Sequence, residues 1–262
     1  MNNLDQSSEL QKYDTTINVI GGIKDHELIF STIELYFNDE PIKANEFNFR
    51  TERSRTRIDR GIKTAFLQFK NKEHQDFIQS VFASDLELRI KEAILFFQFA
   101  LTNRLFRDLS IKIFAKAYLS GKIFISKEIL IGYLKDFVNQ NEEVRSKWSE
   151  STIRTLATKY LNFLTKIGFI EGVRKKSFKR ILVSSDLLVL FLYILEINEP
   201  HNRNILTNEM LPLIFIDKND IQERLKKLSL KGHFNMDFNG VELNIELTHG
   251  YKGICDVLSA RT

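Results

Sequence analysis

The sequence predicts a mainly α protein: an N-terminal helical bundle, a winged helix-turn-helix unit, and a smaller C-terminal helix-hairpin unit. Apolar residues recur at helical spacing through much of the 262-residue chain, and strand composition is limited to short stretches. Only 3 Pro and 11 Gly interrupt this pattern, which favours long helices. A hydrophobic content of 43%, including 22 Phe, indicates folded cores rather than disorder.

We expect four consecutive parts along the chain. The first residues are polar and lack a hydrophobic signal region, which predicts a mobile tail. The parts are residues 1–14 (mobile tail), 15–107 (N-terminal helical domain), 108–200 (winged-helix-like domain) and 201–262 (C-terminal helix and β-hairpin unit).

In the N-terminal domain, apolar spacing predicts four helices and one connection, at 40–47. The helices cover 24–37, 53–69, 74–83 and 85–106. The helix at 53–69 is amphipathic, with arginines and one lysine on the arc opposite its apolar face. Two interpretations of that basic arc stay open: contact with a phosphate backbone, or a solvated face of a bundle helix.

The next part has the element order that a winged helix requires. Helices are expected at 108–121, 126–141 and 149–167, followed by strands at 169–173 and 178–183. Gly121 is expected to end the first helix, and Ser126 is a good N-cap for the second. Between the strands lies a basic loop, residues 174–177, and a further apolar helix is expected at 186–197.

The helix at 149–167 is the candidate recognition helix. Ser149 suits its N-cap, and Gly168 suits its end, because glycine adopts the left-handed conformation at little cost. Its outer face carries small hydroxyls, one amide and lysines, which suit close approach to a groove and contact with phosphates. A lone basic helix is more often a surface helix beside a solvated hairpin. The helix followed by a basic wing favours nucleic-acid binding instead.

The C-terminal part repeats the helix-helix-hairpin order on a smaller scale. Helices are expected at 204–215 and 218–232, and Asn239-Gly240 is a strong hairpin signal within 233–247. This hairpin carries Asp237, Glu242 and Glu246, so we expect it to serve in packing or partner binding rather than in phosphate contact.

Positive charge is concentrated in two segments. Arg145–Arg180 holds ten basic and two acidic residues, net +8, and Arg50–Lys63 holds six and two, net +4. Because the net charge of the whole chain is only +4, the residues outside these two segments carry a net charge of −8. Such concentration is the electrostatic footprint of a polyanion binder. The predicted DNA-binding residues are Arg50, Arg53, Arg57, Arg60, Lys63, Ser151, Arg154, Thr155, Thr158, Lys159, Asn162, Lys166, Arg174, Lys175, Lys176, Lys179 and Arg180.

No pattern in the sequence predicts a catalytic site, a metal site or a cofactor site. The five histidines lack ligand spacing, and neither a phosphate-binding loop nor a serine nucleophile elbow is present. The single cysteine, Cys255, reads as a small core residue and excludes a disulfide framework, which favours a reducing cytoplasm. The apolar stretches 86–106 and 186–197 are charge-interrupted or too short to span a bilayer, so we expect no membrane association.

Three segments together resemble the BrxA family of the BREX systems, by which bacteria exclude phage. They are residues 45–66, 105–121 and 148–171, of which Trp148-Ser149-Glu150-Ser151-Thr152 and Gly168-Phe169 are the most specific. The resemblance covers roughly residues 20–258, in pattern more than in identity. It implies a small, non-enzymatic, mostly helical protein with helix-turn-helix units that binds DNA and is encoded beside a methyltransferase, an ATPase and other BREX components. From the basic helix and wing, our first hypothesis is that the ligand is double-stranded DNA. It supplies no contact residues. A scaffold for other BREX proteins and an RNA-binding module remain alternatives.

Overall fold

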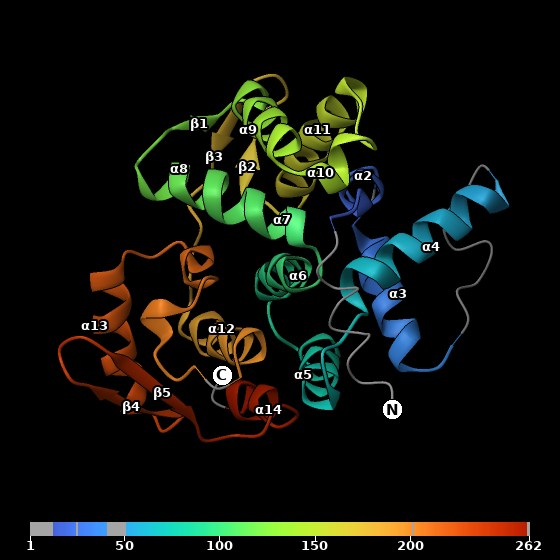
Figure 1. The fold of residues 1–262 in the computed structure, drawn as a ribbon. Helices are drawn as coiled ribbons and strands as arrows, with labels where there is room; N and C mark the ends of the chain where they lie inside the picture. The colour runs from blue at the N-terminus through green and yellow to red at the C-terminus, as the bar shows by residue number, and fades with distance from the viewer. Residues whose placement is uncertain (1–12, 25, 41–50, 201, 261–262) are drawn as a thin grey trace. The chain divides into compact units, whose positions relative to one another are not determined.

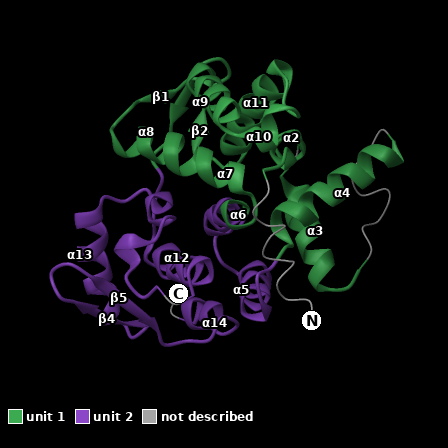
Figure 2. Cartoon of the chain, viewed as in Figure 1, with its two compact units in different colours: residues 1–68, 99–180 green, residues 69–98, 181–262 purple. Residues whose placement is uncertain are grey.

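The structure is a computed structural model that describes residues 13–24, 26–40, 51–200 and 202–260. As predicted, it is mainly α-helical, with small antiparallel sheets (Figure 1). By its contacts the chain forms two compact units, each built from two separate segments (Figure 2). Unit 1 comprises residues 1–68 and 99–180, and unit 2 comprises 69–98 and 181–262. The four consecutive domains expected from the sequence remain a prediction.

Unit 1 begins with three helices, α2 (Thr16–Ile20), α3 (Glu27–Phe37) and α4 (Glu52–Phe66). The predicted helices at 24–37 and 53–69 are confirmed as α3 and α4, whereas α2 was not predicted. Most of the expected connection at 40–47 lies outside the described residues, as do residues 1–12 of the expected mobile tail. The last residues of that tail, Tyr13 and Asp14, form hydrogen bonds with Asp108 and Asn103.

The predicted single helix at 85–106 is wrong at Asn103. The chain forms α6 (Leu88–Thr102) and then α7 (Arg104–Leu109), because Asn103 takes an extended conformation and its side chain accepts a hydrogen bond from the Phe106 N–H at 2.8 Å. From α7 the chain continues through a π-helical segment, η1 (Ser110–Ala115), into α8 (Lys116–Leu119). Gly121, with φ +75°, follows the end of α8, as predicted.

A three-stranded antiparallel sheet and two longer helices complete unit 1. In chain order these elements are β1 (Phe124–Ile125), α9 (Lys127–Gln140), α10 (Glu142–Arg145), α11 (Glu150–Lys166), β2 (Ile170–Glu171) and β3 (Lys176–Phe178). Strand β3 lies between the other two, in the order β1-β3-β2. The predicted N-caps Ser126 and Ser149 are confirmed, because each hydroxyl accepts a backbone N–H three residues later. Gly168 follows the end of α11 with φ +73°, also as predicted.

The predicted strand at 178–183 is wrong, and the strand lies nearer the turn. Strand β3 begins at Lys176, because Ser177 pairs with Glu171 on one side and with Phe124 on the other. Gly172, with φ +96°, allows the tight turn between β2 and β3. The hairpin β2–β3 is therefore shorter than expected. Its second strand, β3, is the central strand of the three-stranded sheet and is paired on both sides.

Buried aromatic rings form the core of unit 1 and explain part of the high Phe content. Phe99 stacks on Phe106 at 4.2 Å between ring centroids, and Phe163 of α11 contacts both rings. Phe66 joins them from α4 and Tyr160 from α11. This cluster fixes α11 against α4, α6 and α7, so the outer face of α11 is held on a rigid support.

Unit 2 contains α5 (Lys72–Ala83), most of α6, and the apolar helix α12 (Ser185–Asn198), which confirms the helices predicted at 74–83 and 186–197. Phe77 of α5 stacks on Tyr193 of α12 at 5.6 Å, and Phe97 of α6 packs on Phe191 at 4.7 Å. The apolar stretch 186–197 thus lies in this core, while the stretch 86–106 contributes its first part to unit 2 and residues 99–106 to unit 1. None of the helices within the described ranges is long and apolar enough to cross a membrane.

The C-terminal part of unit 2 differs from the prediction in one element. The helix expected at 204–215 is instead two 3₁₀ turns, η2 (Ile205–Thr207) and η3 (Leu211–Ile214), because Pro212 and the backbone-bonding amides of Asn204 and Asn208 break it. The remaining elements are α13 (Lys218–Ser229), β4 (Phe234–Phe238), β5 (Leu243–Leu247) and α14 (Ile254–Ser259). They confirm the helix and hairpin predicted there.

The hairpin of unit 2 turns one residue later than the Asn-Gly signal indicates. The Asn239 N–H donates to the Glu242 carbonyl at 3.3 Å, which places Gly240 and Val241 at the centre of the turn. Gly240 carries the positive φ, +95°, and the Asn239 side chain accepts from the N–H groups of Val241 and Glu242. Asn239 therefore caps the turn instead of forming its centre.

Candidate nucleic-acid interface

The first half of the outer face of α11 is open to solvent. Ser151, Arg154 and Thr155 are exposed. The Thr155 hydroxyl donates to the Ser151 carbonyl at 2.8 Å, so its proton is used within the helix and its lone pairs remain available as acceptors. Arg154 pairs with Glu150, which also binds Lys135 at 3.0 Å, and these cations lower the pKa of the Glu150 carboxyl.

The second half of that face lies beside α2, an element that the sequence did not predict. A Cβ built on Gly21, directly after α2, would lie 2.0 Å from the Lys159 carbonyl oxygen, so only glycine permits this approach of two backbones. The Lys166 ammonium donates to the Gly21 carbonyl at 3.3 Å. Burial, together with the charge of Lys159, lowers the pKa of Lys166 to about 8. The Lys166 side chain therefore supports α2 in addition to any role at the outer surface, and Lys159 contacts Gly21 through its backbone.

In the hairpin between β2 and β3, the predicted cations differ in their surroundings. Lys176 is an internal brace, since its ammonium donates to the Gly172 carbonyl at 2.7 Å and to the Thr165 hydroxyl at 3.0 Å. Lys175 lies over the Phe124 ring, 4.1 Å from its centroid, in a cation–π contact. Arg174, like Lys179 and Arg180 after β3, is exposed and forms no ion pair with any residue that the structure describes.

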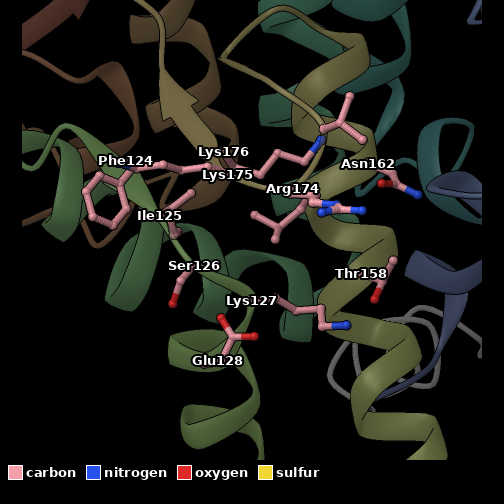
Figure 3. Close-up of a pocket in the computed structure, with 12 residues that line it drawn as sticks. Phe124, Ile125, Ser126, Lys127, Glu128, Thr158, Asn162, Arg174, Lys175 and Lys176 are labelled. Carbon is pink, nitrogen blue, oxygen red and sulfur yellow. The ribbon is translucent and has the colours of Figure 1, made fainter.

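A pocket of about 530 Å³ lies between the hairpin, α11 and the start of α9 (Figure 3). Its polar lining includes Lys127 from α9, Thr158 and Asn162 from α11, and Arg174 from the hairpin. In Figure 3, Arg174 extends in the direction of α11 near Asn162, and Lys127 does so near Thr158. Cations and hydrogen-bonding groups from three elements therefore line one concave surface.

The second basic segment forms the exposed side of α4. Arg53, Arg57 and Arg60 are exposed without an ion pair to any described residue, while Lys63 pairs with Asp59 at 3.0 Å. The predicted site residue Arg50 lies outside the described residues.

Helix α2 connects the two basic segments within unit 1, because it packs against both α4 and α11. A Cβ on Gly61 of α4 would lie 2.5 Å from Cγ1 of Val19, and Gly21 allows the equally close contact with α11. The described part of the Arg50–Lys63 segment and the Arg145–Arg180 segment thus belong to one compact unit, although about 80 residues separate them. The contact of these predicted residues with DNA remains a prediction.

Sequence reasoning missed Phe124, Lys127 and Val173 as lining residues of the pocket. Phe124 and Lys127 precede α11 by more than 20 residues and join it through the pairing of β1 with β3 and the packing of α9 on α11. Val173 is 92% exposed, and an apolar residue directly before three cations was the one local signal that could have drawn attention to it.

Two buried titratable groups belong to the cores. His74 lies in unit 2 between the Lys70 N–H and Gln98, and Cys255 is buried, as predicted, with its sulfur 3.4 Å from the Ser80 hydroxyl. Burial lowers the pKa of His74 to about 4 and raises the pKa of the Cys255 thiol. Among the described residues, no group of three His, Cys, Asp or Glu side chains is arranged to hold a metal ion.

Comparison with known proteins gives one family. The BrxA family model matches residues 37–192, which is more than half of the chain and includes α4, α11 and the hairpin. No curated protein and no solved structure matches. The match covers both basic segments, and the chain therefore belongs to the BrxA family, whose members are components of BREX defence systems.

Proposed function

We propose that this protein binds double-stranded DNA, as a non-catalytic BREX component, through a winged helix-turn-helix in unit 1. The observation that carries the proposal is the sheet order β1-β3-β2, with β1 before α9 and the basic hairpin directly after α11. This is the order of a winged helix, in which α11 is the recognition helix and residues 172–175 form the wing. The family is generally considered non-catalytic, which agrees with this proposal.

The distribution of charge supports a polyanionic ligand for unit 1. Unit 1 holds 26 basic and 18 acidic residues, net +8, whereas unit 2 holds 12 and 16, net −4. The exposed cations Arg174, Lys179 and Arg180 lack acidic partners among the described residues, so they remain available for phosphate. The arginines of α4 add a second phosphate-binding surface in the same unit. Contacts of this kind release counterions, and affinity then depends steeply on salt.

The salt dependence of duplex binding tests the proposal. The double variant Arg174→Ala/Lys175→Ala removes two wing charges and spares the internal brace Lys176. We expect the slope of log K against log salt to become shallower by about 2, at roughly 0.9 per phosphate contact. The matched control is Lys218→Ala/Lys226→Ala on α13, which removes two exposed lysines from unit 2 and should leave the slope unchanged. Equal slopes in all three proteins would remove the wing from the interface.

A scaffold for other defence components is the second candidate. The hairpin β4–β5 favours it, because Asp237, Glu242 and Glu246 are exposed there beside Val241, which is also exposed. Such a surface fits a basic partner protein better than a nucleic acid. Charge reversal of the three acids should abolish co-purification with BREX proteins if this candidate holds, and it should leave duplex binding unchanged if unit 1 alone binds DNA.

RNA binding is the weaker alternative. Phe178, the aromatic residue of the basic segment that could serve as a stacking platform, packs against Phe114 at 5.2 Å and Tyr118 at 5.6 Å. Its ring is thus engaged within unit 1. Gel shifts with matched duplex DNA, single-stranded DNA and RNA should show duplex DNA as the preferred ligand, and a preference for RNA would reject the proposal.

A further inference from the structure

We infer that the pocket between the wing and α11 receives one unpaired nucleotide of the bound DNA, with its phosphate on the cations and its base against the apolar wall. This inference rests on the proposed function and names a ligand for part of the same surface. Contact with a paired backbone requires exposed cations, whereas a hollow of about 530 Å³ has the size of a pocket for a small organic molecule.

The apolar part of the lining suits a base. Ile125 and Leu161 are buried and form part of the wall, while Phe124 and Val173 are 44% and 92% exposed. A phosphate gains nothing from these four side chains. A planar base would remove the exposed Phe124 and Val173 from water and would pack on a wall that Ile125 and Leu161 complete. Contacts between bases and apolar or aromatic side chains contribute substantially to single-strand recognition.

The polar part of the lining provides complementary groups for the rest of a nucleotide. Asn162 is partly buried, and its amide makes no hydrogen bond to any described residue, so both its donors and its acceptor are available for a base edge. Lys127 and Arg174 approach from two other elements (Figure 3) and form no ion pair within the described ranges. With Lys175 and Lys176 they outnumber the carboxylate of Glu128 in the lining, so the net charge of the pocket is positive and matches a phosphate attached to that base.

The test compares two DNA duplexes of the same sequence, one fully paired and one with a single bulged 2-aminopurine. We expect the bulged duplex to bind roughly tenfold more tightly at the same salt concentration, a ratio within the range for one stacked base. We also expect acrylamide to quench the 2-aminopurine fluorescence less in the complex than in free DNA, because the pocket shields the base.

Variants distinguish the pocket from the general basic surface. Asn162→Ala and, separately, Val173→Ser should each bring the ratio of the affinities for the bulged and the paired duplex close to one. Val173 is so exposed that its replacement does not disturb the core. The matched control Lys179→Ala removes a cation outside the pocket and should weaken binding of both duplexes equally.

The failure of this inference is distinguishable from the failure of the proposed function. Equal affinity for the two duplexes, or an unchanged bulge preference in both pocket variants, overturns the nucleotide pocket while DNA binding stands. Absence of binding to either duplex overturns both.

Discussion

At the scale of single residues, His74 shows how burial of a neutral imidazole makes stability depend on pH. The Lys70 N–H donates to Nδ1 at 3.2 Å, so Nε2 carries the proton and donates to Gln98 Oε1 at 2.6 Å. A second proton would displace the first of these hydrogen bonds and would lie near the charge of Lys70. Burial, more than that charge, accordingly lowers the pKa of His74 from its ordinary 6.5 to about 4.

The sign of the pH effect follows from this depressed pKa. Between pH 6.5 and 4 the unfolded chain binds a proton at His74 that the folded chain does not, so the free energy of unfolding falls as pH falls. We expect a loss of about 3 kcal/mol from this group over that range. Urea titrations at pH 7 and pH 4.5 should show a smaller loss in His74→Gln than in the natural chain. His249→Gln is the control and should retain the full loss; identical losses in all three proteins would contradict the assignment.

At the scale of elements, the sequence predicted those helices and turns that carry their own signals. Ser126 and Ser149 cap helices, and Gly168 follows one, because the groups that satisfy the helix ends lie within three or four residues. Asn103 carried the same kind of signal, but the apolar residues around it matched a continuous helix, and the cap was missed. Capping residues therefore predict the end of a helix well only where the apolar pattern of the sequence also stops.

Helix α2 and strand β1 could not be predicted, because each depends on distant residues. Helix α2 has five residues, too few to be stable alone, and packs against α4 and α11. Strand β1 has two residues and exists through pairing with β3, about 50 residues later. Both omissions affect the candidate site: α2 engages Lys159 and Lys166, and β1 carries Phe124 into the pocket. The basic surface was therefore predictable in its charge but not in its shape.

The packing of α2 on α11 gives a prediction about glycine. Gly21→Ala would place a Cβ 2.0 Å from the Lys159 carbonyl oxygen, and neither backbone can move without separating the helices. We expect a loss of about 1–3 kcal/mol in the free energy of unfolding, typical of overpacking. Gly132→Ala in α9 is the matched control: a Cβ there meets nothing within 4 Å, so it should be neutral or stabilising by about 0.5–1 kcal/mol. Chemical denaturation measures both, and equal effects would show that α2 does not constrain α11.

At the scale of the whole molecule, the net charge is positive in unit 1 and negative in unit 2. The salt dependence of DNA binding can therefore show whether the two basic segments of unit 1 act together. Unit 1 carries net +8 and contains both segments, which α2 connects. If both contact one duplex, the phosphates that each neutralises should add in the salt dependence of binding. If α4 is instead a solvated face of the bundle, its arginines should contribute nothing to that dependence.

The salt dependence of an α4 variant distinguishes a helix that contacts the duplex from a solvated face of the bundle. Arg53→Gln/Arg57→Gln/Arg60→Gln removes three exposed charges from α4 while keeping good helix formers. We expect the salt slope to become shallower by about 3 in this variant and by about 5 when Arg174→Ala/Lys175→Ala is added, at roughly 0.9 per contact. A slope unaffected by the α4 substitutions, together with a normal response to the wing substitutions, would restrict the interface to α11 and the wing. Circular dichroism at the assay temperature should show the same helix content in every variant, since these side chains are exposed and none braces the fold.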